Sequence, residues 1–203
     1  MIKKLALVAA LLGIVLYSLN GIKTNLSVYA AQLNKFRREK NRDFRQAANS
    51  PLTAAQKAVF DSLSYYPADL DFVLSATISR SPRPDTILIQ MSAYRAEKYI
   101  HWGQAQFKFE NQNQQLGIYL KANGVDSTLF IPFTDRTNGH ETYGGGRYLD
   151  APLPKLDEPE MTLDFNRAYN PYCAYNSEYS CPVPPAENRL PIAIPAGEKS
   201  FHD

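Results

Sequence analysis

A change of hydrophobic period after Tyr66-Pro67 constrains the fold of this chain more than any other feature. Before it, apolar residues recur at helical spacing; after it, they alternate with polar residues, as in a strand with one buried face. Five such strands follow, over residues 72–78, 87–91, 99–109, 116–120 and 129–133. Because the connections between them are short, the strands should pair antiparallel. We therefore expect a mainly β (α+β) fold whose antiparallel sheet is curled or closed into a partial barrel.

Two helices are predicted before this sheet. Residues 26–46 carry apolar side chains on one helical face and basic side chains, including Arg37 and Lys40, on the other. We expect the basic face to be solvated, because a charged helix face most often points to water. Thr53 and Gln56 form a capping-box signature for a second, shorter helix. The apolar stripe of that helix should consist of Val59, Phe60 and Leu63.

The N-terminus has the pattern of an export signal or a membrane anchor. Lys3 and Lys4 precede residues 5–19, which carry no charge. As a helix this run would span roughly 22 Å, short of a hydrocarbon core of about 30 Å, and extension through residue 22 nearly closes the gap. We favour a retained anchor over cleavage after Ala30. Either option places the protein in the cell envelope, outside the cytoplasm, anchored in the inner membrane or periplasmic, with the membrane as its N-terminal partner.

Residues 23–49 then form the amphipathic helix, and residues 50–203 a single β-rich domain. The composition of that domain changes at about residue 134. Nine of the 14 prolines lie from Pro152 onward, and six of the 13 tyrosines lie between Tyr143 and Tyr179. So many prolines interrupt regular structure, while the aromatic content is too high for a disordered tail. We expect an irregular but ordered wrap that covers the edges of the sheet.

Charge and residue counts exclude several functional classes. A net charge of +2 provides no basic footprint for nucleic acid. Two cysteines and three histidines are too few for a disulfide-dense scaffold or a four-cysteine zinc site. The chain also lacks a phosphate-cradling loop and the common hydrolase and metalloprotease motifs. We assign no cofactor and no metal, and the sequence leaves open whether the protein is an enzyme.

Asp135, His140 and Glu141 form the only compact group with acid, base or metal-ligand chemistry. Three such donors within seven residues could hold a divalent ion, or could supply the acid and base of a hydrolase. A loop rich in Thr, Asn and Gly around such residues is more often a solvated hairpin tip, which is the interpretation we favour.

Two polar segments are candidates for ligand binding. Gly144, Gly145 and Gly146 before Arg147 could form an anion-binding nest, or a tight turn with Arg147 paired to a local acid such as Asp150; we favour the turn. Residues 163–173 could form a ligand cradle or a hydrogen-bonded network that fixes the C-terminal wrap, and the network is slightly favoured. The candidate ligand-binding residues are Arg147, Tyr148, Asp164, Asn166, Arg167, Tyr169 and Asn170.

Cys173 and Cys181 are the only cysteines of the chain. In an exported protein, two cysteines at this spacing most often form a disulfide that closes a short loop. The chain-entropy model gives such a nine-residue loop roughly 2.5 kcal/mol of stabilisation. The alternative is a cysteine nucleophile with His140 or His101 as base, and nothing in the spacing supports it.

Three segments also resemble a known family. They begin Phe133-Thr-Asp-Arg-Thr-Asn-Gly-His-Glu-Thr-Tyr-Gly-Gly-Gly-Arg147, Leu163-Asp-Phe-Asn-Arg-Ala-Tyr-Asn-Pro-Tyr-Cys173 and Cys181-Pro-Val-Pro-Pro-Ala-Glu-Asn-Arg-Leu190. Together they are similar to a bacterial family catalogued as domain of unknown function 1684, over about residues 29–199. The resemblance implies no activity, and it indicates that the segments 133–150 and 163–190 are what the family shares.

Two functional hypotheses follow from these observations. The first is an exported, membrane-anchored module that binds a small ligand, possibly anionic, or a protein partner near Arg147 and Arg167. The second is a hydrolase that uses Asp135 or Glu141 with His140. We further predict that both arginines lie within reach of Asp164 or Glu141, since an unpaired buried guanidinium is very unfavourable.

Overall fold

The computed structural model describes residues 25–122, 128–155 and 157–202. The predicted export segment over residues 1–22 and the predicted turn at residues 123–124 lie outside this part of the chain. Among the helices that the model describes, none combines the length and the apolar character needed to cross a membrane.

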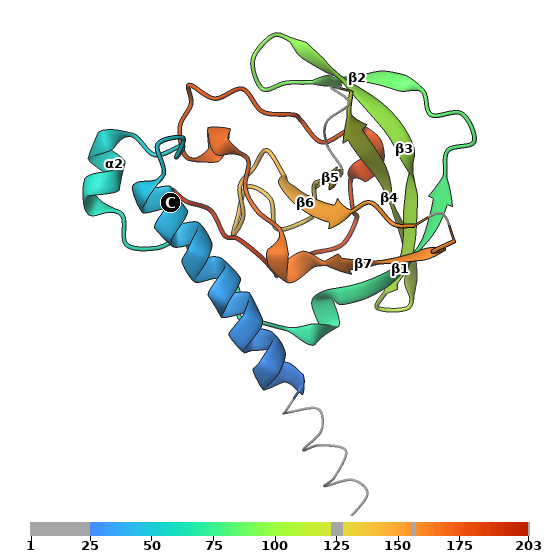
Figure 1. Ribbon diagram of the computed structural model, residues 1–203, viewed down its shortest axis with the longest axis horizontal. Coiled ribbons are helices and arrows are strands. Elements are labelled where there is room, and N and C mark those ends of the chain that lie inside the picture. The colour runs from blue at the N-terminus through green and yellow to red at the C-terminus, as the bar shows by residue number, and fades with distance from the viewer. Residues whose placement is uncertain (1–24, 123–127, 156, 203) are drawn as a thin grey trace, which may run out of the picture.

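The first described element is a helix over residues 25–46, and a mostly β body follows it (Figure 1). Its helices are α2 (Ala54–Val59) and the 3-10 helices η1 (Leu70–Phe72), η2 (Phe165–Arg167), η3 (Tyr172–Ala174) and η4 (Ala186–Asn188). Its strands are β1 (Val73–Arg80), β2 (Thr86–Gln90), β3 (Ala96–Phe109), β4 (Gln112–Lys121), β5 (Thr128–Phe133), β6 (Arg147–Pro152) and β7 (Glu160–Asp164).

The seven strands form one antiparallel sheet in the order β6-β5-β4-β3-β1-β7, with β2 paired to β3 beside this path. The sheet curls until its two end strands approach each other, so the body is a nearly closed barrel (Figure 1). The predicted mainly β fold with two N-terminal helices is therefore confirmed.

β3 is long enough to serve two neighbours on the same edge. Its first half pairs with β2 and its second half with β1, and the register shifts between His101 and Gly103, at the predicted bulge. A Cβ at Gly103 would lie 2.5 Å from the main-chain oxygen of Ser79, so only glycine allows this close approach. Glu110 and Asn111 both have positive φ, which produces the tight turn into β4.

Two local expectations differ from the structure. β6 and β7 are regular strands within the segment expected to be irregular, because Pro152 is the last residue of β6 and Pro159 precedes β7, so neither interrupts a strand interior. α2 has a capping box between Thr53 and Gln56, as predicted, but it ends at Val59, whose side chain is 84% exposed. Phe60 and Leu63 contribute their apolar surface after the helix has ended.

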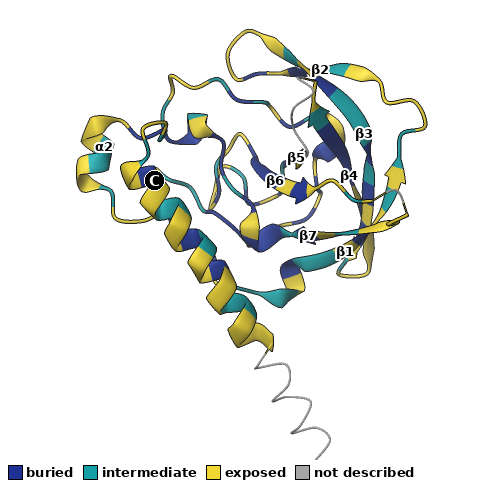
Figure 2. Ribbon diagram, in the orientation of Figure 1, coloured by how far each residue is buried: buried dark blue, intermediate teal, exposed yellow. Residues whose placement is uncertain are grey.

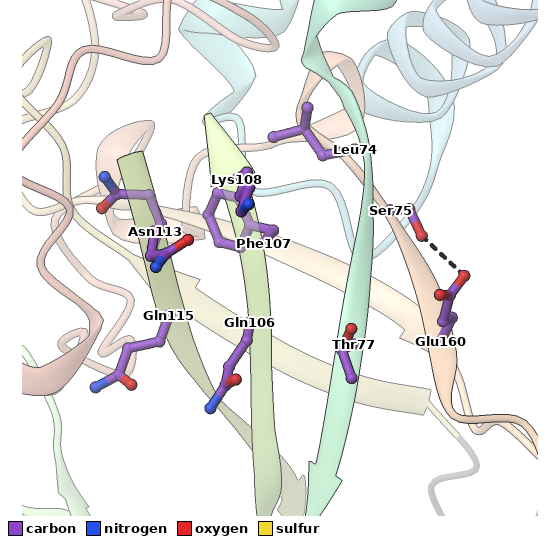
Figure 3. Close-up of a pocket in the computed structure, with 10 residues that line it drawn as sticks. Leu74, Ser75, Thr77, Gln106, Phe107, Lys108, Asn113, Gln115 and Glu160 are labelled. Atoms are coloured by element: carbon purple, nitrogen blue, oxygen red, sulfur yellow. Dashed lines mark hydrogen bonds between the residues drawn. The ribbon is translucent and has the colours of Figure 1, made fainter. Parts of the chain in front are cut away.

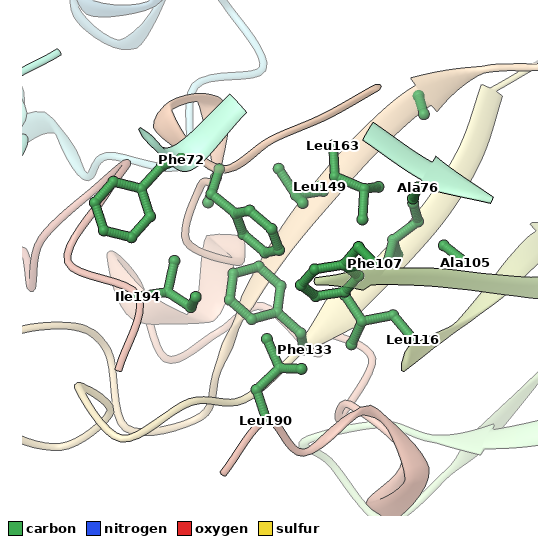
Figure 4. Close-up of a cluster of buried hydrophobic side chains, with 14 of the residues drawn as sticks. Phe72, Ala76, Ala105, Phe107, Leu116, Phe133, Leu149, Leu163, Leu190 and Ile194 are labelled. Carbon is green, nitrogen blue, oxygen red and sulfur yellow. The ribbon is translucent and has the colours of Figure 1, made fainter. Parts of the chain in front are cut away.

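The barrel interior is filled by side chains from the strands and from the C-terminal segment (Figure 4). Phe133 packs edge-on against Phe165, whose ring also contacts Phe107. Leu190 and Ile194, which belong to no strand, are almost fully buried in the same cluster. Burial of one such side chain stabilises by about 1.5–3 kcal/mol. The irregular C-terminal segment therefore also contributes to the core.

Candidate functional site

A buried ion pair between Arg147 and Asp135 connects β6 with the turn after β5 and with the C-terminal segment. Arg147 Nη2 lies 2.7 Å from Asp135 Oδ2, and both side chains are 0% exposed. The guanidinium also donates to the main-chain oxygens of Ile194, Ala196 and Glu198. Arg147 therefore joins the start of β6 to the C-terminal segment.

The other oxygen of the Asp135 carboxylate is equally occupied. Asp135 Oδ1 accepts hydrogen bonds from the N–H and the hydroxyl of Thr137 and from the N–H of Ile194. A carboxylate with this many donors and no exposed surface cannot reach a substrate. His140 and Glu141 are exposed on the adjoining turn. The structure thus removes Asp135 from the predicted acid–base group, while His140 and Glu141 lie together on one exposed turn.

The predicted partner of Arg147 is wrong. Glu141 is exposed, Asp150 accepts a hydrogen bond from Tyr169, and Asp164 pairs with Arg167 instead. Arg147 pairs instead with Asp135. The sequence predicts that Asp135 lies at a solvated hairpin tip, whereas its side chain is buried. Burial and pairing also leave the guanidinium unavailable to an anionic ligand.

The predicted pairing of Arg167 with Asp164 is confirmed, at 3.2 Å between Nε and Oδ2. The Arg167 side chain is 47% exposed and lies over the ring of Phe36. The two arginines therefore belong to two separate ion pairs, one sealed and one at the surface.

The N-terminal helix is attached to this body by polar side chains. Tyr29 donates to Asp164 Oδ1 at 2.8 Å, and Arg37 donates to the main-chain oxygens of Tyr66 and Asn166. Burial lowers the pKa of Arg37, with its guanidinium stacked over the ring of Tyr65. The expectation of a fully solvated basic face is wrong at Arg37, which is buried against the body. Figure 2 shows that the N-terminal helix has buried segments among its exposed ones.

Glu198 is a second buried charge, at a position where the sequence predicts no site. Its carboxylate is 1% exposed and accepts from the hydroxyl of Tyr175 at 2.5 Å and from the N–H of Asn170 at 2.8 Å. Lys40 of the N-terminal helix supplies the counter-charge at 2.5 Å. Glu198 lies in a polar Gly-Glu-Lys-Ser stretch, which is typical of an exposed terminus, so no local signal marks it as buried.

Most of the predicted ligand-binding residues have structural roles. Asn166 and Asn170 are 1% exposed and bond to main-chain groups of residues 69 and 199. Tyr148 is buried and donates to the oxygen of Pro182. Arg167 is exposed, and Asp164 and Tyr169 are partly exposed. Asn166 and Asn170 therefore act as members of a hydrogen-bonded network that fixes the C-terminal segment, which is the interpretation slightly favoured from the sequence.

A groove of about 510 Å³ separates the N-terminal helix from the body, and Tyr169 lies in its wall. We call it the helix groove. The side chains that give it its chemistry are Phe36, Lys40, Asp43, Asp150, Tyr169 and Tyr172. The hydroxyl of Tyr169 donates to Asp150 Oδ2 at 2.9 Å, while the Lys40 ammonium lies 4.8 Å from the centre of the Tyr169 ring. The groove thus combines aromatic surfaces with carboxylates that face solvent.

A larger hollow, of about 700 Å³, lies on the outer face of β1, β3, β4 and β7. Figure 3 shows its polar side chains spread along separate strands, with one hydrogen bond, from Ser75 to Glu160, joining two of them. Gln106, Gln115 and Thr77 are exposed, so water competes for each of their hydrogen bonds. This hollow is the solvated face of the sheet that strand alternation predicts. Its polar side chains do not converge on a common point where a ligand could be held.

The two cysteines lie side by side as free thiols, with the N–H of Cys173 3.2 Å from the sulfur of Cys181. Their disulfide stays a prediction. Within the described ranges, no three side chains among His, Cys, Asp and Glu gather as metal ligands would.

Comparisons with known proteins add a family and one solved relative. The model of a family described as a protein of unknown function, DUF1684, matches residues 58–199. The solution NMR structure of an uncharacterised protein from Haloarcula marismortui is similar to this chain, with 35% sequence identity and a TM-score of 0.70, over 89% of this chain and 98% of that one. The curated proteins give no match. The family predicted from the segments 133–150 and 163–190 is confirmed.

Proposed function

Since this chain belongs to the DUF1684 family of proteins of unknown function, its own geometry must supply the argument, and we propose that it binds a small organic cation in the helix groove. The observation that carries the proposal is the combination, in one groove, of aromatic rings with more carboxylates than cations. Binding is thus assigned to Tyr169 and to the surface around it rather than to Arg147.

Charge is the first argument. The groove is lined by two carboxylates, Asp43 and Asp150, and by one ammonium, Lys40. Glu198, 2.5 Å from Lys40 and almost fully buried, adds a third carboxylate, and Arg42, 3.4 Å from Asp43, adds a second cation. The local balance is therefore negative, and it favours a cationic ligand over the anionic one considered from the sequence.

The aromatic walls are the second argument. Tyr169 and Tyr172 face the groove from the body, Phe36 and Phe44 from the helix. Tyr172 is 41% exposed and contacts Phe44 edge-on, so its ring is held in place while part of its surface remains open. Lys40 already lies over Phe44 and Tyr169, and Arg167 over Phe36, so a ligand cation would mainly contact the Tyr172 ring. Such a contact contributes about 0.5–2 kcal/mol.

Calorimetric titration of the full-length chain tests the proposal. Choline serves as the probe, dimethylbutanol as its neutral carbon isostere, and inorganic phosphate as an anion. We expect choline to bind at least about tenfold more tightly than the isostere, because a cation–π contact and a carboxylate together contribute about 1.4 kcal/mol or more. Binding of phosphate without binding of choline would refute the proposal.

Two substitutions identify the site. Asp150→Asn keeps an oxygen that can accept from Tyr169 but removes the charge, and should weaken choline binding by about three- to tenfold. Asp157→Asn is the matched control, since Asp157 is exposed and does not line the groove. Equal affinities of the two variants would exclude the helix groove as the binding site.

We also propose that the protein meets its ligand outside the cytoplasm, held at the membrane by residues 1–22. Lys3 and Lys4, followed by a charge-free run, support this location. Cell fractionation with measurement of the mature mass tests it. A soluble protein that starts at Ala31 would contradict a retained anchor, and full-length protein in the cytosol would contradict export.

A further inference from the structure

Cys173 and Cys181 form a compact pair with unequal surroundings. Cys173 lies in η3 (Tyr172–Ala174) and is partly exposed, whereas Cys181 is 8% exposed, in the segment that bridges Met91 to Pro182. The N–H of Cys173 donates to the sulfur of Cys181 at 3.2 Å. The hydroxyl and the main chain of Ser92 hold the main chain of Cys181 in place. Cys173 is therefore the more exposed residue of the pair, and Cys181 the more buried one.

Hydrogen bonds around Cys173 favour its thiolate. The Cys181 thiol donates to the sulfur of Cys173 and, with the hydroxyl of Tyr143 at 3.7 Å, lowers the pKa of Cys173 to about 6 despite partial burial. The same hydrogen bond raises the pKa of Cys181, and burial acts in the same direction. At neutral pH the accessible sulfur is a nucleophile, while the buried one keeps its proton.

We propose that these residues form a redox-active dithiol site that exchanges with small disulfides, with Cys173 as the attacking residue and Cys181 as the resolving residue. The geometry carries the proposal: the N–H of Cys173 contacts the sulfur of Cys181, Cys173 is the less buried residue, and the hydroxyl of Tyr143 lies 3.7 Å from the Cys173 sulfur. This inference goes beyond the helix groove, and it requires no cation.

Exchange with an external disulfide proceeds in two steps. The Cys173 thiolate attacks one sulfur of a disulfide such as oxidised glutathione; the external S–S bond breaks and one thiolate leaves. Cys181 then transfers its proton to solvent and attacks the sulfur of Cys173, which releases the second thiolate. Two electrons pass from the protein dithiol to the external disulfide, and the Cys173–Cys181 bond remains.

The second step is promoted by the first. While Cys173 is a thiolate, its hydrogen bond with Cys181 is the largest cause of the raised pKa of that thiol. Once Cys173 is in a mixed disulfide, its negative charge is gone, and Cys181 loses its proton more readily. The resolving residue is therefore held inactive until the mixed disulfide has formed.

Alkylation of the reduced, native, full-length protein is the first test. Iodoacetamide should modify Cys173 with half-maximal rate near pH 6 and leave Cys181 unmodified until the protein is denatured. Tyr143→Phe should move that midpoint upward, whereas Tyr94→Phe, at a fully exposed tyrosine, should not. A midpoint at the ordinary thiol pKa of about 8.5, or equal reactivity of both cysteines, would overturn the proposal.

Trapping with oxidised glutathione is the second test. Cys181→Ser should accumulate a glutathione mixed disulfide on Cys173, while Cys173→Ser should form the corresponding adduct at least tenfold more slowly, since its remaining sulfur is buried. The unmodified chain should form the internal disulfide and return to two thiols with reduced glutathione. A disulfide that native conditions cannot reduce would show a purely structural cross-link and refute the exchange, whatever the result with choline.

Discussion

Arg147→Met should be among the most destabilising substitutions in this protein. Methionine fills much of the arginine volume, so the main loss is the ion pair with Asp135, in which both side chains are 0% exposed. Removing one partner leaves an uncompensated buried carboxylate, which costs about 3–5 kcal/mol. The oxygens of Ile194 and Ala196 also lose their guanidinium donor. For a chain of this size, a loss of that magnitude lowers Tm by about 6–20 °C.

Arg167→Met is the matched control for this experiment. It breaks a pair of the same chemistry, with Asp164 at 3.2 Å, but the Arg167 side chain is 47% exposed. Water and salt screen such a pair, so the expected loss is at most about 1 kcal/mol. Urea denaturation of the parent and both variants, followed by circular dichroism, measures the difference in unfolding free energy.

A double variant distinguishes the cost of an unpaired buried charge from the cost of lost packing, by whether the second substitution raises or lowers the free energy of unfolding. Adding Asp135→Asn to Arg147→Met removes the uncompensated charge but keeps an oxygen for the Thr137 and Ile194 donors. The double variant should be about 1–2 kcal/mol more stable than Arg147→Met alone. If Arg147→Met costs no more than Arg167→Met, or if the second substitution destabilises further, the reasoning from burial is wrong.

Three further predictions concern a glycine, the buried tyrosines and the helix attachment. Gly146→Ala should destabilise by more than 1 kcal/mol in thermal melts, because Gly146 has φ +92° and a Cβ would lie 2.7 Å from a main-chain oxygen. Burial raises the pKa of Tyr148 and Tyr175 above the unfolded value of about 10, so these tyrosines should leave the free energy of unfolding unchanged below pH 10. Above pH 10 it should fall by up to about 1.4 kcal/mol per pH unit for each tyrosine, and Tm should fall with it; a flat Tm profile to pH 12 would contradict this. Lys40→Met should destabilise by about 2–3 kcal/mol in urea and make the N-terminal helix more accessible to protease, because Glu198 then lacks its counter-charge; unchanged proteolysis would show that this pair does not hold the helix.

The local sequence pattern alone predicts the strands and the fold class. Alternation of apolar and polar side chains places β1 to β5 within a few residues of their positions, and the bulge at Gly103 is where a glycine interrupts the longest strand. These features depend on neighbours in sequence, which is why they can be read without the structure. Prolines obscured β6 and β7, since their number says little about whether they fall inside a strand or beside it.

The tertiary structure alone decides which charges are buried and with which partners. Asp135 and Arg147 look like loop residues, and Lys40 and Glu198 come from opposite ends of the chain, yet each pair is sealed from solvent or nearly so. The helix groove is likewise made of side chains from the N-terminal helix and the C-terminal half of the body. A charged side chain has the same sequence signal whether it faces water or a buried counter-ion. The difference in free energy arises only when the chain excludes water around it, and that depends on contacts between distant residues.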